Sequence, residues 1–390
     1  MNNTRKVKSL QLFFVLLLAG LFLLFPGTAR AKQMARIEPK IPDIPGYLTL
    51  KCDFHLHTVF SDGLVWPTVR VYEAYLEGLD VISITDHIEY QPFEDDVKKN
   101  LNRAHELATP LAKRSGWITL IKGAEITRDM PPGHFNALFL KDSNPLNKEN
   151  FLDCIQAAAD QGAFVYWNHP WIDQDSAIWR PQHTVAYEKG ILRGIEVVNG
   201  EDYNPSAHRL CIEKKLTMLA GSDLHQPSNM VFDPRHGARR PMTLVFATAR
   251  SEEAIREALF DRRTAIYSHD SLYGERRFLE PIFNLSVEIL NPELEIEGRQ
   301  VAVVRVRNRS DIPYDLIADG TLEEFLFTDR IFLVPDASVA FQVISKADTL
   351  SGRRQLALPF RVANLRLSPE EALPVKLELN VTFKPAEKKK

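Results

Sequence analysis

Histidine and acidic side chains recur in this sequence at the ends of short apolar segments. His55 and His57 are two residues apart, so on a β-strand both imidazoles point to the same face. Asp62 follows in the next loop. The complete set of candidates is His55, His57, Asp62, His87, Glu125, His134, His169, Asp223 and His225. Imidazole nitrogens and carboxylate oxygens gathered in one place are typical ligands of divalent transition metals such as Zn, Mn or Fe.

Each of these residues taken alone has an ordinary explanation. A lone His-x-His pair is more often two ordinary core or surface histidines, Glu125 could cap a helix, and Asp223 could hold a turn. Their order and their shared position at segment ends are what predict a metal site. So many ionisable groups brought together without a counter-charge would be costly. We therefore expect two to three divalent metals, provided that the fold gathers these segment ends.

The segments that must position these residues alternate in kind from Tyr47 to about Asp270. Apolar runs predict buried strands over 48–57, 81–86, 118–126, 135–140, 164–168, 195–199 and 218–223. Helical patterns predict helices over 67–79, 94–113, 148–161, 205–215 and 252–262. Strands that alternate with helices form βα units around a parallel sheet or barrel. Seven strands favour a barrel, and ligands collect at the C-terminal edge of such strands.

The pattern changes near residue 280. A period of two then predicts strands over 283–290, 301–308, 315–318, 330–334, 338–344, 356–362 and 375–383. This pattern indicates an appended antiparallel β-sandwich of roughly 100 residues. We expect a barrel domain over 32–278 and a sandwich domain over 279–390. Phe278, Leu279, Ile282 and Phe283 form an apolar junction, so the two domains are expected to be docked rather than tethered.

The candidate residues lie in short motifs that together resemble those of the polymerase and histidinol phosphatase (PHP) superfamily. The motifs are His55-Leu56-His57-Thr58 with Ser61-Asp62-Gly63, Thr85-Asp86-His87, Gly123-Ala124-Glu125-Ile126, Gly133-His134-Phe135-Asn136-Ala137, Asn168-His169-Pro170 and Gly221-Ser222-Asp223-Leu224-His225. The resemblance covers the chain from residue 47 to about residue 270. It implies an α/β fold, a distorted (β/α)7 barrel, with three metals at its C-terminal mouth.

The resemblance also implies how the ligands divide. The first metal would be held by His55, His57, Glu125 and Asp223. Glu125 would bridge to the second metal, which His134 and His169 would also hold. Asp62, His87 and His225 would hold the third. Every position carries an acceptable ligand type, whereas some relatives in this superfamily have lost ligands and act as scaffolds.

The activity that the resemblance implies is hydrolysis of phosphate esters. Metals ~3.5–4 Å apart can lower the pKa of a bridging water and neutralise phosphoryl oxygens, so a bridging hydroxide attacks without a Ser or Cys nucleophile. Glu125 and Asp86 are the candidate catalytic residues. Asp86, next to His87, is expected to act as an orienting residue or a proton carrier, or else as a helix or turn cap. Two alternatives stay open: a phosphodiesterase acting on nucleotides or glycans, and a non-catalytic binding protein whose barrel the metals stabilise.

Contacts to the substrate are expected from basic residues in loops. The segment Trp171–Arg180 follows His169 and should lie over the mouth of the barrel. Arg180, Arg235 and His236 are candidates to bind a phosphate, with the alternative that each is a solvated loop residue. The remaining histidines are His105, His183, His208 and His269, which match no motif and are expected to be ordinary.

The first 31 residues predict a secretory signal peptide. Arg5, Lys6 and Lys8 precede an apolar run from Ser9 to Phe25, and Ala29-Arg30-Ala31 forms a small-x-small cleavage site. The alternative is an uncleaved membrane anchor, although the run is short of a span of ~20 residues. We therefore expect a secreted or periplasmic protein without a membrane attachment after cleavage.

The composition bounds the class of protein and its partners. Apolar residues make up 45% and charged residues 25%, which is typical of a folded globular chain. Residues 1–31 hold four of the 48 basic residues and none of the 51 acidic ones, so the remainder is more acidic than the net charge of −3. An acidic chain lacks the footprint of a nucleic-acid or membrane binder. Among the phosphate esters that the resemblance implies as substrates, a small one is therefore the expected partner. Cys52, Cys154 and Cys211 are too few for a disulfide framework and are expected to be buried thiols.

Overall fold

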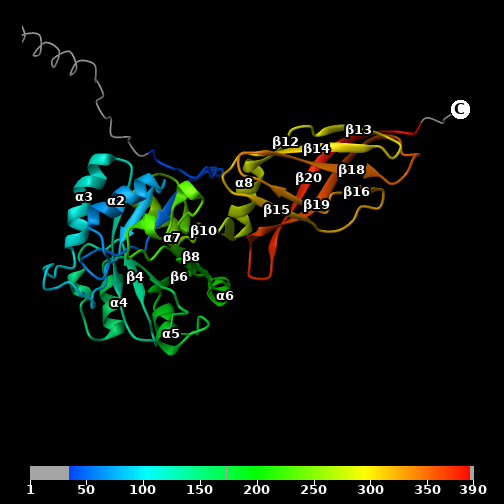
Figure 1. The fold of residues 1–390 in the computed structure, drawn as a ribbon. Coiled ribbons are helices and arrows are strands. Elements are labelled where there is room, and N and C mark those ends of the chain that lie inside the picture. Colours follow the sequence, from blue (N-terminus) through cyan, green and yellow to red (C-terminus); the bar gives the residue numbers. More distant parts are fainter. Residues whose placement is uncertain (1–34, 173, 387–390) are drawn as a thin grey trace, which may run out of the picture. The chain divides into compact units, whose positions relative to one another are not determined.

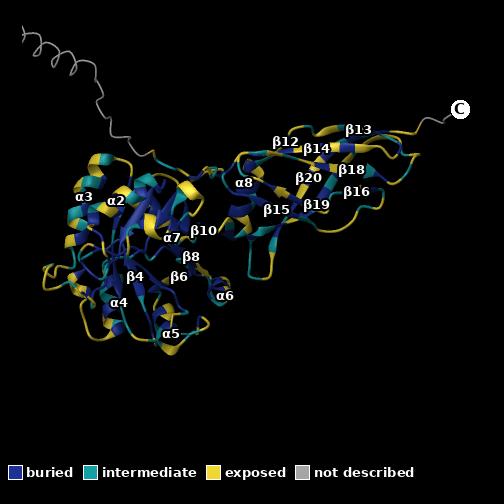
Figure 2. Ribbon diagram, viewed as in Figure 1, coloured by how far each residue is buried: buried dark blue, intermediate teal, exposed yellow. Residues whose placement is uncertain are grey.

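The computed structural model describes residues 35–172 and 174–386, so the predicted signal peptide over 1–31 lies outside the described residues. Each of the seven apolar runs forms a strand, and nearly all of their residues are buried (Figure 2). The strands are β1 (Leu48–Asp53), β2 (Val81–Ile84), β3 (Thr119–Ile126), β4 (Phe135–Leu138), β5 (Phe164–Trp167), β6 (Leu192–Asn199) and β8 (Thr217–Gly221). They follow one another from β1 to β6, and β8 pairs with β6.

The ring of strands closes through residues that lie beyond the ends of β1 and β8. Leu56 forms a parallel bridge with Leu224, and the N–H of His57 donates to the carbonyl of Leu224 at 3.1 Å. The first part of β1 pairs instead with β9 (Met242–Ala247), which runs antiparallel to it. The expected (β/α)7 barrel is therefore present and distorted: it closes at the C-terminal end of β1, where the candidate residues lie.

Strand β4 runs against its neighbours, although the sequence predicts parallel units throughout. Both the β3–β4 and the β4–β5 pairs are antiparallel, and Ile126 lies opposite Phe135. The connection between β3 and β4 is too short for the crossover helix that a parallel pair needs. The reversal puts the start of β4, rather than its end, at the C-terminal edge of the other strands. His134, which directly precedes β4, therefore lies at that edge.

Helices pack around the barrel strands (Figure 1). They are α2 (Pro67–Leu76), α3 (Arg103–Ser115), α4 (Phe151–Ala159), α5 (Pro181–Glu188), α6 (Pro205–Lys214) and α7 (Glu252–Phe260). The helix predicted over 94–113 is wrong up to residue 102, where the side chain of Asn100 accepts the N–H of Asn102 and competes with helical hydrogen bonds. The sequence does not predict helix α5, because this helix buries only His183 and Ala186 and so has no periodic apolar face. Across residues 35–172 and 174–386, no helix has the length and apolarity of a membrane span.

The C-terminal strands form a two-layered sandwich. One layer holds β13 (Glu293–Glu297), β20 (Ala372–Lys384), β19 (Gly352–Arg366), β15 (Tyr314–Ala318) and β17 (Arg330–Leu333). The other holds β12 (Val287–Ile289), β14 (Val301–Asn308), β18 (Ser338–Ser345) and β16 (Phe325–Phe327). Most pairs are antiparallel, as predicted, and alternate residues such as Val304 and Phe360 are buried in one shared core.

The barrel and the sandwich are joined by β10 (Thr264–Ser268), β11 (Ser271–Gly274) and helix α8 (Arg276–Ser286). The strand predicted over 283–290 is wrong up to residue 286, and the expected boundary at 278/279 falls inside this helix. The helix buries its apolar residues at a helical spacing. Phe278 stacks on Phe246 of β9 with 4.4 Å between ring centroids, and Phe283 packs against Tyr314 of β15 at 5.2 Å.

Candidate metal centre

The fold brings all nine candidate residues together at the C-terminal mouth of the barrel. Their ligand atoms form four groups, and within each group all the atoms lie within 4.8 Å of one another. The groups are His57, Asp62, His87 and His225; His55, His57 and Asp223; His55, Glu125 and His169; and His87, Glu125 and His134. Because neighbouring groups share residues, they form one continuous cluster rather than four separate sites.

The carboxylate of Glu125 lies inside this cluster. Its Oε2 atom is 3.2 Å from the Nε2 atoms of both His55 and His57. Its Oε1 atom is 3.0 Å from Nδ1 of His134 and 3.5 Å from Nε2 of His169. The two oxygens thus face two different sets of imidazoles. Glu125 is fully buried within β3, so the alternative that it caps a helix is wrong.

Asp223 approaches the imidazoles of His55 and His57 from the segment that follows β8. Its Oδ1 atom lies 3.2 Å from Nε2 of His55 and 3.0 Å from Nε2 of His57. Asp223 has a φ of 53° and His169 has a φ of 22°. Both values lie in the left-handed region, which residues other than glycine rarely adopt. Such backbone conformations concentrate at functional sites, where the surrounding structure holds them.

Asp62 forms the other side of the cluster. Its Oδ1 atom lies 3.2 Å from Nε2 of His225 and 3.6 Å from Nε2 of His87. The ring of His225 stacks on that of His57 with 4.2 Å between centroids. This side of the cluster is more open, since the side chain of His225 is 30% exposed while His57 is fully buried.

Several of these close approaches lack the geometry of hydrogen bonds. Nε2 of His57 and Oδ1 of Asp62 are buried and have no hydrogen-bond partner. A buried polar atom left unpaired costs about 1–3 kcal/mol. Atoms held about 2.0–2.1 Å from a shared cation lie about 3.0–3.4 Å from one another, which is close to the spacing found around Glu125 and Asp223. The donor set therefore fits divalent cations better than it fits an internal hydrogen-bond network.

The carboxylates also control the charge of the imidazoles. Burial by itself lowers the pKa of His57, but Asp223 and Glu125 outweigh it and raise this pKa to about 9. Burial is likewise outweighed at His55, whose pKa the surrounding carboxylates hold well above its ordinary value. Without metals these imidazoles carry protons that balance the acidic side chains. Binding of cations in their place releases those protons, because a ligating imidazole must be neutral.

Two asparagines that the sequence analysis did not assign hold the carboxylates in place. Nδ2 of Asn168 donates to Oε1 of Glu125 at 2.9 Å, and Nδ2 of Asn199 donates to Oδ2 of Asp223 at 3.3 Å. Asn168 could have been found from the sequence, because it directly precedes the candidate ligand His169 in the Asn-His-Pro motif. Asn199 ends β6, a strand that carries no candidate ligand, and nothing in the sequence points to it.

Asp86 contacts the loop that follows β1 rather than the cluster. Its carboxylate accepts the N–H of Thr58 at 2.6 Å, the Oγ1–H of Thr58 at 2.7 Å and the Oγ–H of Ser61 at 2.8 Å. These hydrogen bonds fold the chain into the turn that presents Asp62. The contacts are those of an orienting residue, and its assignment as a proton carrier stays a prediction.

Two buried arginines support the loops beneath the cluster. Arg70 donates to the carbonyl oxygens of His57 at 2.9 Å and Leu224 at 2.7 Å, which ties the two closing segments together. Arg240 pairs with Asp53, the last residue of β1, at 3.0 Å. Both guanidinium groups are fully buried. Both arginines therefore have a structural role and are not available to bind a substrate.

The three candidate phosphate contacts are exposed residues. Arg235 and His236 both pair with Asp233 at 2.9 Å, in an exposed 3-10 turn over Pro234–His236. Arg180 is exposed and directly precedes α5. Their role as phosphate contacts stays a prediction.

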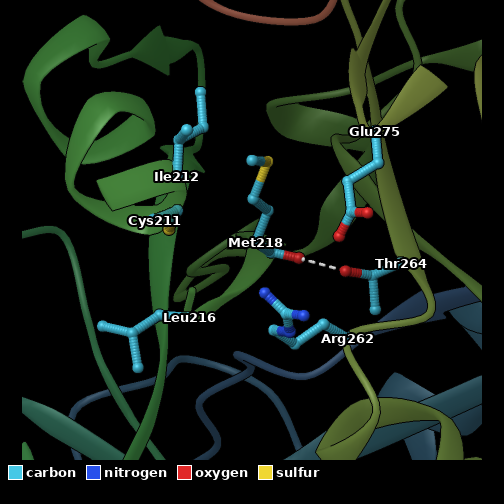
Figure 3. Close-up of a pocket in the computed structure, with 7 residues that line it drawn as sticks. All are labelled: Cys211, Ile212, Leu216, Met218, Arg262, Thr264 and Glu275. Carbon is cyan, nitrogen blue, oxygen red and sulfur yellow. Dashed lines mark hydrogen bonds between the residues drawn. The ribbon is translucent and has the colours of Figure 1, made fainter. Parts of the chain in front are cut away.

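A small cavity of about 130 Å³ lies at the opposite end of β8 (Figure 3). It is lined by Cys211, Ile212, Leu216, Met218, Arg262, Thr264 and Glu275. Met218 stands near the start of β8, whereas Asp223 and His225 follow its end. The length of the strand therefore separates this cavity from the cluster, and the cavity is not part of the candidate site.

Comparison with known proteins separates the two domains. The model of an Ig-like domain matches residues 287–378, within the sandwich. An uncharacterized protein of Methanocaldococcus jannaschii is 25% identical over 198 residues, which cover 47% of this chain and 85% of that protein. A 5′–3′ exoribonuclease of Haemophilus influenzae is 38% identical over 80 residues, which cover 20% of this chain and 24% of that protein.

One solved structure matches both domains. It is a two-domain protein of Bacteroides vulgatus that contains a predicted PHP-like metal-dependent phosphoesterase. The two chains are 44% identical and superpose with a TM-score of 0.83, over 88% of this chain and 99% of the other. This extent of identity confirms the resemblance drawn from the motifs. The chain belongs to the family of PHP-like metal-dependent phosphoesterases that carry a second, Ig-like domain.

Proposed function

We propose that this chain hydrolyses phosphoric ester bonds with two to three divalent transition metals, Zn, Mn or Fe, held by the nine residues of the cluster. The observation that carries the proposal is the convergence of three carboxylates and six imidazoles in which buried atoms of His57 and Asp62 lack hydrogen-bond partners. Membership of a metal-dependent phosphoesterase family supports the same reading.

When bound, such metals lower the pKa of a water molecule and neutralise the phosphoryl oxygens of an ester. The role of the protein chain itself is to hold and orient the ligand atoms of the metal centre. Glu125 offers one oxygen to each side of the cluster, and Asn168 fixes the direction of its carboxylate. Asp86 fixes the loop of Asp62. These contacts keep the ligand atoms in place before a substrate arrives.

The cysteines do not offer a protein nucleophile to replace this chemistry. Cys52, Cys154 and Cys211 are all buried. Burial raises the pKa of Cys52 well above its ordinary value and raises that of Cys211 as well. A buried, protonated thiol is inert as a nucleophile.

Hydrolysis of a phosphodiester is the second candidate. The similarity to a 5′–3′ exoribonuclease favours it, although only 80 residues match. The acidic balance of the chain favours a small ester over a polyanion, because a polyanion is held chiefly by basic side chains.

We also propose that residues 1–31 direct export of the protein. A mature N-terminus other than residue 32 in protein recovered from an exporting host would refute that cleavage site.

The test uses full-length protein purified without chelator. Elemental analysis should find two to three equivalents of metal, and the loaded protein should hydrolyse an aryl phosphate or a bis-aryl phosphodiester. Preference for the first substrate supports a phosphatase, and preference for the second supports a phosphodiesterase. Metal uptake with hydrolysis of neither ester would support a binding protein. Less than one equivalent of metal, even after reloading, would refute the proposed centre.

A further inference from the structure

Glu196 is a buried carboxylate at the cluster that the motifs do not include. It lies in β6 with no solvent exposure. Its Oε1 atom accepts the Nδ1–H of His55 at 2.8 Å, and its Oε2 atom accepts the backbone N–H of His169 at 2.9 Å. Nδ2 of Asn199 also donates to Oε2 at 3.1 Å. One carboxylate thus contacts residues that follow two other strands, β1 and β5, and the last residue of its own strand.

The contact with His55 decides which nitrogen of that ring is free. An ionised carboxylate only accepts hydrogen bonds, so Nδ1 of His55 must carry the hydrogen that Glu196 accepts. Nε2 is then turned toward the cluster, where it lies 3.2 Å from both Glu125 Oε2 and Asp223 Oδ1. This is the arrangement in which a carboxylate behind a histidine orients the ring and strengthens it as a ligand.

The contact with His169 supports a strained backbone. His169 has a φ of 22°, and Glu196 accepts the N–H of that same residue. The hydrogen bond holds the turn after β5 that aims the imidazole of His169 at Glu125, 3.5 Å from its Oε1 atom. Asn199 completes the link, because its Nδ2 atom contacts both Glu196 and Asp223.

The charge of Glu196 has no lysine or arginine partner among the described residues; its ion-pair partner there is the imidazole of His55. Burial of a carboxylate costs several kcal/mol, which this ion pair has to offset. The chain nevertheless makes room for it. A Cβ atom added at Gly221 would overlap with Oε1 of Glu196 and come within 2.7 Å of Cβ of His55. Glycine at this position therefore allows the carboxylate and the imidazole to meet.

We propose that Glu196 is a positioning residue of the metal centre, which fixes His55 and His169 as ligands and adds a fourth carboxylate to the charge that attracts cations. This inference rests on the proposed function, in that the cluster must bind metal. It predicts that the role of Glu196 is visible in metal affinity and not only in the stability of the fold.

The experiment compares full-length wild-type protein with Glu196→Gln. A glutamine has one oxygen for three donors, so it cannot accept from His55, His169 and Asn199 together. We expect metal affinity, measured with Zn or Mn by competition with a chelator, to fall about 10- to 100-fold. The rise in Tm on adding the metal should shrink with it, since stabilisation by a ligand follows its Kd. The matched control is Glu201→Gln, an exposed residue in the turn after β6, which should behave as wild type.

A role in folding alone gives a different result: the Tm falls equally with and without metal, and affinity is unchanged. That outcome would overturn the inference. If Glu196→Gln does not fold, Glu196→Asp decides, because it keeps the charge but shortens the reach to His169; wild-type affinity in that variant would also overturn the inference. A wild-type chain that takes up no metal would instead refute the proposed function, so the two failures are distinguishable.

Discussion

Nδ1 of His134 lies 3.0 Å from Oε1 of Glu125, across the antiparallel pair of β3 and β4. The two residues meet because the short connection after β3 is followed by the antiparallel strand β4. The end of β3 and the start of β4 therefore lie at the same edge of the barrel. Oε2 of the same glutamate faces His55 and His57. Glu125 therefore stands between two halves of the cluster.

Replacement of Glu125 tests this central position. We expect Glu125→Gln to lower turnover by at least about 100-fold, because the variant loses the negative charge that faces both sets of imidazoles. Metal content should also decrease. Turnover and Tm measured on one preparation, with the exposed Glu188→Gln as control, would check this. A variant that keeps most of its activity would show that Glu125 is dispensable to the chemistry.

Asp86 offers a test of how the loop of Asp62 is held. In Asp86→Asn one acceptor oxygen becomes a donor, so the hydrogen bonds from Thr58 and Ser61 cannot all persist. We expect about 1–3 kcal/mol of lost stability and a loss of metal from the side of the cluster that contains Asp62. Elemental analysis and denaturant unfolding measure both. If metal content is retained and only the pH profile of turnover changes, Asp86 acts as a proton carrier instead.

The junction of the two domains predicts the effect of truncation. A chain of residues 32–278 keeps all nine candidate ligands but loses Leu279, Ile282 and Phe283, which are buried on α8. We expect a lower Tm, because their apolar contacts are lost. We still expect metal uptake and hydrolysis of small esters. Unaltered metal content without activity on any small ester would show that the sandwich contributes to the active site.

His183 predicts a pH dependence of stability. Burial lowers its pKa to about 4, and the neutral ring is fully paired, with Nδ1 accepting the N–H of Arg180 and Nε2 donating to the carbonyl of Pro132. The unfolded chain binds a proton near the ordinary pKa of about 6.5, so folded stability is full above that pH and falls as the pH drops toward 4. His183→Gln should make the slope of unfolding free energy against pH shallower by up to about 1.4 kcal/mol per pH unit. Denaturant titrations from pH 7.5 to 4.5 measure it; an unchanged slope would show that His183 does not titrate in this range.

The kinds of secondary-structure element and the set of candidate residues can be predicted from local sequence patterns. Buried strands such as β5 are recognisable because both faces are covered, which leaves uninterrupted apolar runs. Strand β14 was recognisable for the opposite reason, since one face is solvated and its residues alternate. The candidates stood out because residues such as Asp223 and His225 end an apolar run with ionisable groups. The sequence does not predict α8 as a helix, because its apolar residues are interpreted as a domain junction and its last residues as the start of a strand.

The direction of β4, the partners of Asp86 and the presence of Glu196 at the cluster become visible in the folded chain. The partners of Asp86 and of Glu196 depend on contacts between residues far apart in the chain, such as the 2.8 Å approach of Glu196 to His55 across 141 residues. A buried glutamate in an apolar strand has no sequence pattern that reveals its role, because its partners come from other strands. Local sequence patterns indicate whether a residue is buried or exposed. The neighbours of a buried charged residue depend instead on how the ring of strands closes.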